Sequence, residues 1–109
     1  MSTAEQGDAD PALIFAALGD RTRLALLTRL GGGAQSIASL SAGTRITRQG
    51  VTKHLRVLER AGLVRALKQG RESRFEIDGQ RIEEARSYLD QVAGQWDDAL
   101  ARLKAFVER

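Results

Sequence analysis

The sequence predicts a mainly helical domain with one small β-hairpin. Apolar residues recur at helical spacing in five segments, and glycines or polar cap residues separate these segments. The spacing changes to strand-like alternation only once, after residue 62. A chain of 109 residues with one proline, five aromatic residues and no cysteine fits a single helix-rich domain that is held together by an apolar core.

Two helices are predicted near the N-terminus. They follow a polar segment, residues 1–9, which lacks periodicity and is expected to be a disordered tail to the domain at 10–109. Asp10 and Pro11 suit the N-cap and first position of a helix that ends at Gly19. Asp20 suits the N-cap of a second helix, which ends at the glycines 31–33. The apolar stripe expected on this second helix consists of Leu24, Leu26, Leu27 and Leu30.

Residues 36–61 predict a helix-turn-helix. Ser36 suits the N-cap of a short helix, and Gly43 lies in the link that follows it. Thr47 suits the N-cap of a longer helix over residues 48–61, which Gly62 ends. A short helix joined to a longer one across a brief glycine-containing link is typical of this motif.

After Gly62 the pattern is that of a β-hairpin over residues 64–78. Polar residues separate the apolar ones, and the segment QGRES lies at the expected turn. The apolar residues of this alternation are Val64, Ala66, Phe75 and Ile77. A basic hairpin that follows a helix-turn-helix is a wing, so the predicted fold is a winged helix-turn-helix. The basic residues of this wing are Arg65, Lys68, Arg71 and Arg74.

The last predicted helix spans residues 81–107 and carries a continuous apolar stripe. Its members follow a 3-4 spacing: Ile82, Ala85, Leu89, Val92, Trp96, Ala99, Leu103 and Phe106. At ~1.5 Å per residue this helix is about 40 Å long, whereas a domain of this size has a radius of gyration near ~13 Å. We therefore expect a homodimer, with Trp96 as the main anchor. The alternative is that the stripe packs within the chain's own core.

Charge is unevenly distributed along the chain. Residues 45–74 contain nine basic and two acidic residues, a net charge of +7, while the remainder has a net charge of −4. Such a segment favours a polyanion as partner, although a merely solvated basic surface gives the same count.

The helix at 48–61 has the pattern of a DNA-reading helix. On a helical wheel Val51, Leu55 and Leu58 form one stripe, and the opposite side is polar and basic. Such a helix can present its outer face to the major groove of double-stranded DNA. Residues of its first turns are expected at base edges, with His54 alongside, and Arg56 and Arg60 at phosphates. The main expected contact set is Thr47, Arg48, Gln49, Thr52, Lys53, His54, Arg56, Lys68, Arg71 and Arg74.

Several of these residues also have a structural interpretation. Arg56 can pair with Glu59, Thr47 can serve only as a cap, and His54 can be structural or inert. A single histidine is a poor metal site. We expect no metal and no cofactor, although Asp90, Asp97 and Asp98 provide oxygen ligands on the last helix.

The motifs LGDRTRLALLTRL, VTKHLRVLERAGLV and GRESRFEID resemble those of the ArsR/SmtB family of winged helix-turn-helix repressors. The resemblance covers residues 10–107. It implies a homodimer that binds partly palindromic operators and is built by the first and last helices. The complete interface set is then Leu13, Ile14, Leu89, Val92, Trp96, Leu103 and Phe106.

The resemblance also identifies a missing feature. Many members sense metals through a Cys-x-Cys pair on the short helix, and the matching positions here are Ser36 and Ala38. The chain is therefore similar to the group of members without these cysteines, which often act as local repressors.

Other classes fit the sequence less well. A protein-interaction module of the anti-activator type, with the fold but no operator, is compatible with the apolar stripe but does not predict the +7 segment. An enzyme is not expected, because no nucleophile–base set and no phosphate-binding loop is present. A polar N-terminus and the lack of a long apolar run predict a cytoplasmic protein with no membrane contact.

Overall fold

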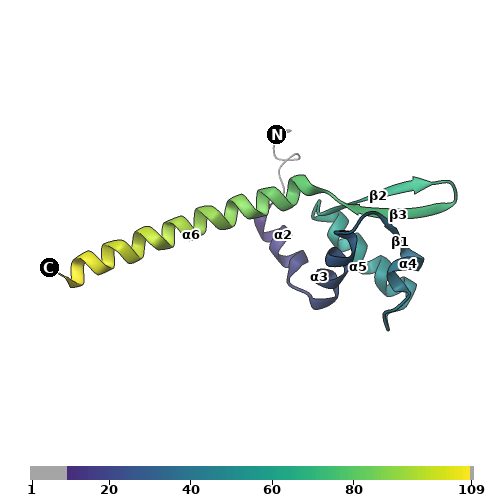
Figure 1. Cartoon of the computed structure of the whole chain (residues 1–109), viewed down its shortest axis with the longest axis horizontal. Coiled ribbons are helices and arrows are strands. Elements are labelled where there is room, and N and C mark those ends of the chain that lie inside the picture. The colour runs from purple at the N-terminus through teal and green to yellow at the C-terminus, as the bar shows by residue number, and fades with distance from the viewer. Residues whose placement is uncertain (1–9, 109) are drawn as a thin grey trace.

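The computed structural model describes residues 10–108, so the tail predicted at 1–9 lies outside the described residues. Helices α2 (Pro11–Leu18), α3 (Arg21–Leu30), α4 (Ile37–Ser41) and α5 (Arg48–Arg60) form a body with the strands β1 (Gln35–Ser36), β2 (Val64–Gln69) and β3 (Glu72–Ile77). The last helix, α6 (Gly79–Val107), leaves this body and extends far beyond it (Figure 1).

The four predicted N-caps are confirmed. The side chains of Asp10, Asp20, Ser36 and Thr47 each accept a hydrogen bond from a backbone N–H of the first turn, at 3.0–3.1 Å. The start of α6 was predicted two residues too late, because Asp78 caps it and accepts from the N–H of Gln80 at 3.1 Å. Asp78 was not among the predicted caps.

The core lies between the helices and one face of the sheet. Its largest fully buried side chains come from the four helices of the body, from β2 and β3, and from the link before β2: Ile14, Leu26, Leu40, Val51, Leu55, Leu58, Leu63, Val64 and Phe75. The prediction for Leu24 was wrong, since its side chain is 48% exposed. Leu26, Leu27 and Leu30 lie within about 100° of one another on the wheel of α3, and Leu24 lies outside this arc.

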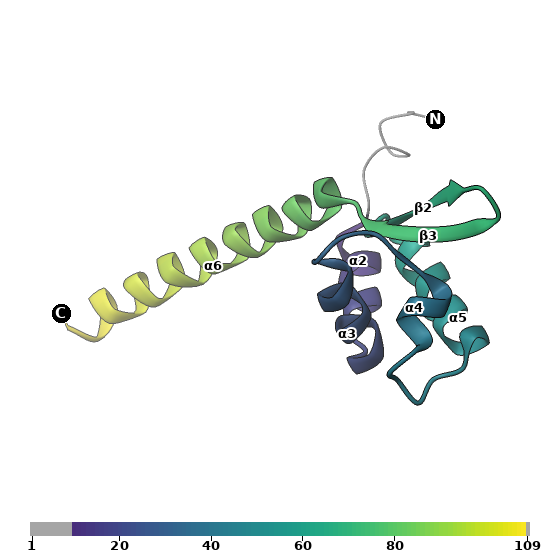
Figure 2. The same cartoon turned by 45° about the vertical axis from the view of Figure 1, so that its right-hand side comes forward.

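The sheet has three antiparallel strands in the order β1-β3-β2. The hairpin predicted at 64–78 is confirmed as β2 and β3, with Gly70 in the turn at φ 61°. The two-residue strand β1 was not predicted; it pairs Gln35 with Phe75. Ala66 pairs with Phe75 but is exposed, and it lies on β2, an edge strand of the sheet. The hairpin projects from the body on the side away from the far end of α6 (Figure 2).

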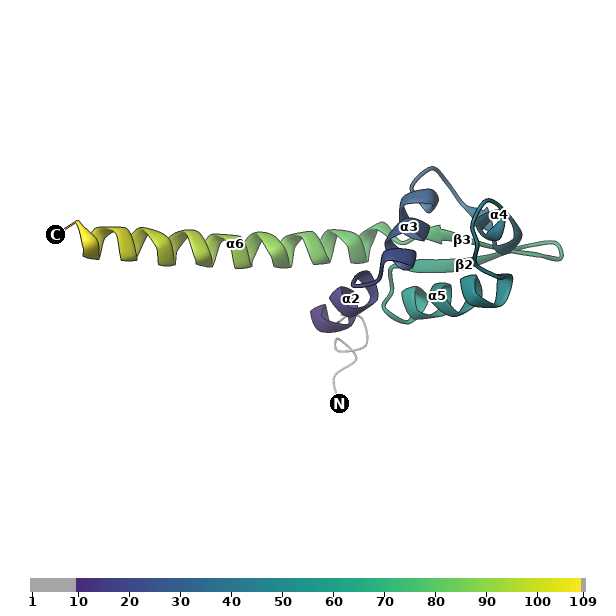
Figure 3. The ribbon, with the colours of Figure 1, turned by 90° about the horizontal axis from the view of Figure 1, so that it is seen from below.

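Helix α6 is attached to the body only through its first turns. Ala85 is its one buried residue, and Ile82 packs partly against the core. Tyr88 stacks at a tilt against Phe15 of α2, with ring centroids 5.8 Å apart. Beyond these contacts α6 runs free of the body (Figure 3). Among the described helices, none combines the length and apolar character that crossing a membrane requires.

Candidate DNA-binding surface

Helix α5 is fixed by its apolar stripe. Val51, Leu55 and Leu58 are 0% exposed and belong to the core. This burial orients the polar side of the helix outward, as the helical wheel predicts. Helix α4 packs against α5, which completes the predicted helix-turn-helix.

The first turns of α5 present free polar groups. Arg48, Gln49 and Lys53 are exposed, and none of their side chains forms a hydrogen bond or ion pair with another residue in the described part of the chain. Their donors are therefore available to a ligand. The absence of any acidic residue in the first turn leaves the partial positive charge of the helix N-terminus uncompensated, which favours an anionic partner.

Two threonines of the expected contact set make local hydrogen bonds. The hydroxyl oxygen of Thr47 accepts from the N–H of Gly50 at 3.0 Å, so its O–H remains available as a donor. The hydroxyl of Thr52 donates to the carbonyl of Arg48 at 2.8 Å and keeps its oxygen lone pairs for a further donor. Both side chains are thus held in defined positions beside the exposed face.

His54 is half-buried and contacts the body instead of lying fully outward. Its Nδ1 atom lies 3.3 Å from a guanidinium nitrogen of Arg23, on α3. Because arginine only donates, His54 accepts through Nδ1 in this arrangement. Arg23 also donates to the carbonyl oxygen of Ala17 at 2.6 Å and to that of Ala16 at 3.3 Å. One arginine thereby connects the end of α2 to the middle of α5, a contact that the sequence analysis missed.

Arg56 has the structural role that the sequence left open. Its guanidinium donates to Glu59 at 2.8 Å and lies 5.9 Å from the centre of the Phe75 ring. The pair is largely exposed, so this ion pair contributes little to stability. Arg60, one turn further, is exposed and unpaired within the described residues.

The basic residues of the wing divide into two groups. Lys68 and Arg71 are exposed near the hairpin tip, and their side chains make no hydrogen bond or ion pair with the described residues. Arg74, by contrast, donates to the carbonyl of Ala34 at 3.0 Å and pairs with Glu72 at 3.4 Å. The structure therefore gives Arg74 a role in holding the sheet to the body.

Arg65 is the other paired residue of the wing. It lies opposite Glu76 and donates to its carboxylate at 2.5 Å. This hydrogen bond raises the pKa of the Arg65 guanidinium above its ordinary value. The unpaired positive charge of the wing is thus concentrated at its tip.

The position of α4 depends on a residue that sequence reasoning did not single out. Arg29, in the last turn of α3, donates to the carbonyl oxygens of Leu40 at 2.7 Å and Ser39 at 2.9 Å. Gln35 in turn donates to the carbonyl of Arg29 at 2.7 Å. The two bonds from Arg29 satisfy carbonyl groups at the end of α4, a helix of only five residues, and the bond from Gln35 satisfies a carbonyl at the end of α3.

Comparison with solved structures identifies the family. A helix-turn-helix domain model matches residues 18–65. An ArsR-like transcriptional regulator from Rhodococcus sp. RHA1 is 38% identical, with a TM-score of 0.80 over 88% of this chain and 91% of that one. The chain belongs to the ArsR family. A further ArsR-family transcriptional regulator is 30% identical, with a TM-score of 0.73 over 79% of this chain and 94% of that one.

A third structure shows the same fold at lower identity. It is a homodimeric winged helix-turn-helix DNA-binding domain from Mycobacterium bovis, described as a possible ArsR-family regulator. It is 24% identical, with a TM-score of 0.63 over 77% of this chain and 78% of that one. The comparison with curated proteins found no match.

This ArsR-family protein is a DNA-binding transcriptional regulator with a winged helix-turn-helix fold, and not an enzyme. It contains no cysteine. Within residues 10–108 no group of three or more histidine, aspartate or glutamate side chains is placed to hold a metal ion.

The ArsR-family chain exposes a large apolar surface on its two outer helices. Trp96 is 65% and Phe106 67% exposed, and Leu13 of α2 is 58% exposed. Further exposed members of this surface on α6 are Leu89, Leu100, Leu103 and Val107. Val92 is half-buried. Ile14 has to be removed from the expected interface, because it is 1% exposed and packs in the core of its own chain.

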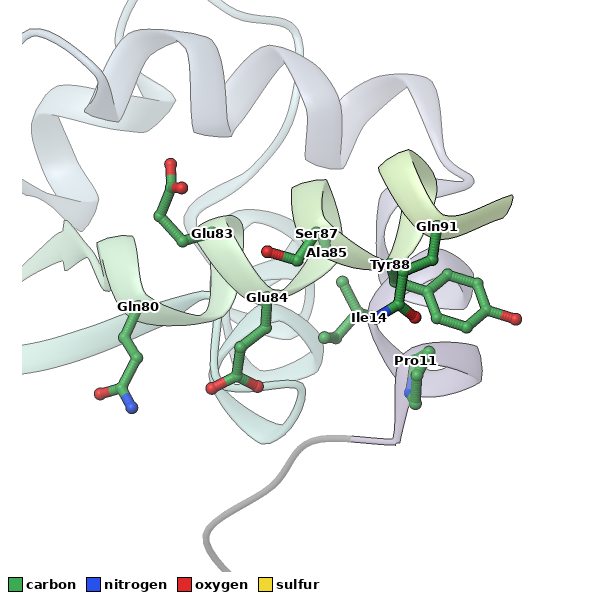
Figure 4. Close-up of a pocket in the computed structure, with 9 residues that line it drawn as sticks. All are labelled: Pro11, Ile14, Gln80, Glu83, Glu84, Ala85, Ser87, Tyr88 and Gln91. Carbon is green, nitrogen blue, oxygen red and sulfur yellow. The ribbon is translucent and has the colours of Figure 1, made fainter. Parts of the chain in front are cut away.

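A groove of about 690 Å³ lies between the start of α2 and the first turns of α6. Figure 4 shows Ile14 between the two helices and the side chains of Glu83 and Glu84 projecting from α6. Glu84 is already paired with Arg81 at 2.6 Å. The groove has no basic residue in its lining, so it is unsuited to a polyanion, in contrast to the outer face of α5.

Proposed function

We propose that this protein is a homodimeric repressor that binds a specific, partly palindromic DNA site. Helix α5 enters the major groove, and the wing, residues 64–78, lies on the adjacent backbone or minor groove. The observation that carries this proposal is the orientation of α5: its apolar stripe is fully buried, and the exposed side presents unpaired basic and amide groups.

Base contacts are assigned to the first turns of α5. Arg48 and Lys53 can donate to guanine O6 and N7, and Gln49 can pair bidentately with adenine. The hydroxyls of Thr47 and Thr52 are positioned at the same end by their backbone hydrogen bonds and serve nearby phosphates or bases.

Phosphate contacts are assigned to the wing tip and to the later turns of α5. Lys68 and Arg71 are the free cations of the wing, and Arg60 is the free cation at the end of α5. Arg56 donates to Glu59 through one guanidinium nitrogen, so its other N–H groups can still donate to a phosphate. Arg74 and His54 act by positioning, through the Ala34 carbonyl and Arg23 respectively, and are not assigned as direct DNA contacts.

Dimerisation is supported by the exposed apolar residues of α6 together with Leu13. The M. bovis domain of the same fold is described as homodimeric. The proposed interface consists of Leu13, Leu89, Val92, Trp96, Leu103 and Phe106. Two-fold symmetry places two copies of α5 in successive major grooves, which explains a partly palindromic site. A dimer bound across a promoter represses by excluding RNA polymerase.

The experiment begins with selection of bound fragments from a genomic library, followed by fluorescence anisotropy of the selected duplex at several salt concentrations. Arg48→Ala and Gln49→Ala should change the preferred sequence, with a loss of ~1–3 kcal/mol at the contacted base pair. Lys104→Ala, which removes one positive charge from α6, is the matched control and should leave both affinity and preference unchanged. Lack of any duplex binding at low salt would refute the proposal.

A further inference from the structure

A second cavity lies where α2, α3 and α5 meet, and its volume is about 390 Å³. Small side chains leave this space, namely Ala16 and Ala17 at the end of α2 and Ala61 directly after α5. Leu13 and Val57 complete the apolar part of its wall. Cavities that hold small organic ligands have volumes of roughly 300–1,000 Å³, so this cavity is large enough for a compact one.

The polar part of the wall is purely basic. Arg23 and Arg60 line the cavity, and no acidic residue does. Arg23 is engaged with the carbonyls of α2 and with His54, and the nearby charges of Asp20 and Arg23 attract each other. Arg60 is exposed and has no hydrogen bond or ion pair within the described residues. The cavity thus combines an apolar wall with one uncompensated positive charge.

We propose that this cavity binds a small organic monoanion with an apolar body, in particular a medium-chain carboxylate. The carboxylate pairs with Arg60, for which bidentate geometry is favourable. The hydrocarbon part covers the alanine, leucine and valine side chains and is removed from water. An uncharged apolar molecule would leave Arg60 without a counter-ion, and inorganic phosphate would leave the apolar wall unfilled.

The position of the cavity connects ligand binding to DNA binding. This step rests on the proposed function, because α2 contributes Leu13 to the proposed dimer surface and α5 is the proposed recognition helix. A ligand between the two helices contacts both of them, so it favours the arrangement of α2 and α5 that fits it best. Binding of the anion and of the operator are then coupled, and each alters the affinity of the other by the same factor.

Octanoate is the probe that tests the site, with the full chain in the absence of DNA. Titration followed by amide chemical shifts should move the signals of Ala16, Ala17, Val57 and Ala61. Arg60→Gln should weaken octanoate binding at least about tenfold, because it removes a charge-assisted hydrogen bond. Arg71→Gln makes the same change of charge at the wing tip and should alter the affinity less than about twofold. Octanol should bind at least about tenfold more weakly than octanoate.

Three results would overturn the site. The first is that the amide signals of the cavity residues do not shift up to about 10 mM octanoate, because any Kd would then lie above this concentration. The second is equal loss of binding in Arg60→Gln and Arg71→Gln, or equal binding of octanol. The third is a change of the cavity signals with protein concentration but not with octanoate, which would show that a second copy fills the space. None of these results concerns DNA, so failure of the site leaves the anisotropy test of the proposed function intact.

Discussion

Replacement of Trp96 by alanine is the sharpest perturbation of the proposed dimer. Trp96 lies midway along the projecting part of α6, and its side chain is 65% exposed although it is the largest apolar group in the sequence. Nothing else in the described chain covers it. If α6 packs against a second copy, this side chain lies at the centre of the new interface, where single aromatic residues contribute most.

The expected magnitude follows from the exposed area. Large aromatic side chains bury ~150–250 Å² when fully covered. Covering the exposed 65% of Trp96 therefore removes roughly 100–160 Å² from water. At ~25 cal/mol per Å² this amounts to about 2.5–4 kcal/mol for one subunit, and a two-fold symmetric dimer loses two copies. Buried area converts imperfectly into affinity, so we count the contribution of one tryptophan and not of two. This predicts at least about a hundredfold rise in the dimer dissociation constant for Trp96→Ala.

Sedimentation velocity over a range of protein concentrations measures this change. Asp98→Ala, on the opposite side of α6 from the apolar stripe, is the control and should dissociate at the same concentration as the unaltered protein. Circular dichroism should confirm that both variants fold, because the tryptophan makes no contribution to the buried core. If Trp96→Ala and the unaltered protein dimerised equally, or if both were monomeric at every concentration, the assignment of α6 as the interface would be refuted.

Four further predictions concern the body and the wing. Lys68→Ala and Arg71→Ala should each weaken binding to all duplexes alike and reduce the salt slope by about one, as seen by anisotropy; a change of preferred sequence instead would contradict their assignment to phosphates. Arg74→Ala should lower the free energy of unfolding by about 1 kcal/mol in urea, because the bond to Ala34 is lost, and should leave the salt slope unchanged. Leu55→Ala removes a 0% exposed side chain and should cost ~2–5 kcal/mol in the same assay; a smaller loss would show that α5 is not fixed by this stripe. The backbone N–H of Arg23 donates to the Asp20 carboxylate and lowers the pKa of Asp20 below its ordinary value of 3.8. The ionised Asp20 therefore stabilises the fold at any pH above 3.8, and this stabilisation is lost as the pH falls through the lower pKa that Asp20 has in the folded protein. Calorimetry should show a flatter acid-side decline of the melting temperature for Asp20→Asn, and an unchanged decline would count against the cap.

Local signals in the sequence predicted most of the fold. N-caps such as Asp20 and Thr47 were predictable because their hydrogen bonds span only three residues. The orientation of α5 was predictable because its three buried aliphatic residues lie on one side of the helix, and that side has to face the core. The strand β1 was not, since two residues carry no periodicity and form a strand only beside β3.

The candidate site was predicted less completely, for the same reason. The Arg74 guanidinium donates to the backbone carbonyl of Ala34 across 40 positions of sequence, and the side chains of Arg23 and His54 meet across 31. No local pattern distinguishes such an arginine from a free one such as Arg71. The error at Ile14 is similar: both Leu13 and Ile14 are apolar residues of one short helix, and only the packed structure shows that Ile14 is directed into its own core.

The central claim, that α5 lies in the major groove, is tested most directly by methylation interference on a selected duplex. Methylation of guanine N7 adds a group in the major groove, where Arg48 and Lys53 are proposed to donate. We predict that methylation blocks binding at guanines in two half-sites, with centres about one helical turn or a whole number of turns apart. Binding that is insensitive to methylation at every guanine of the protected site would contradict the account.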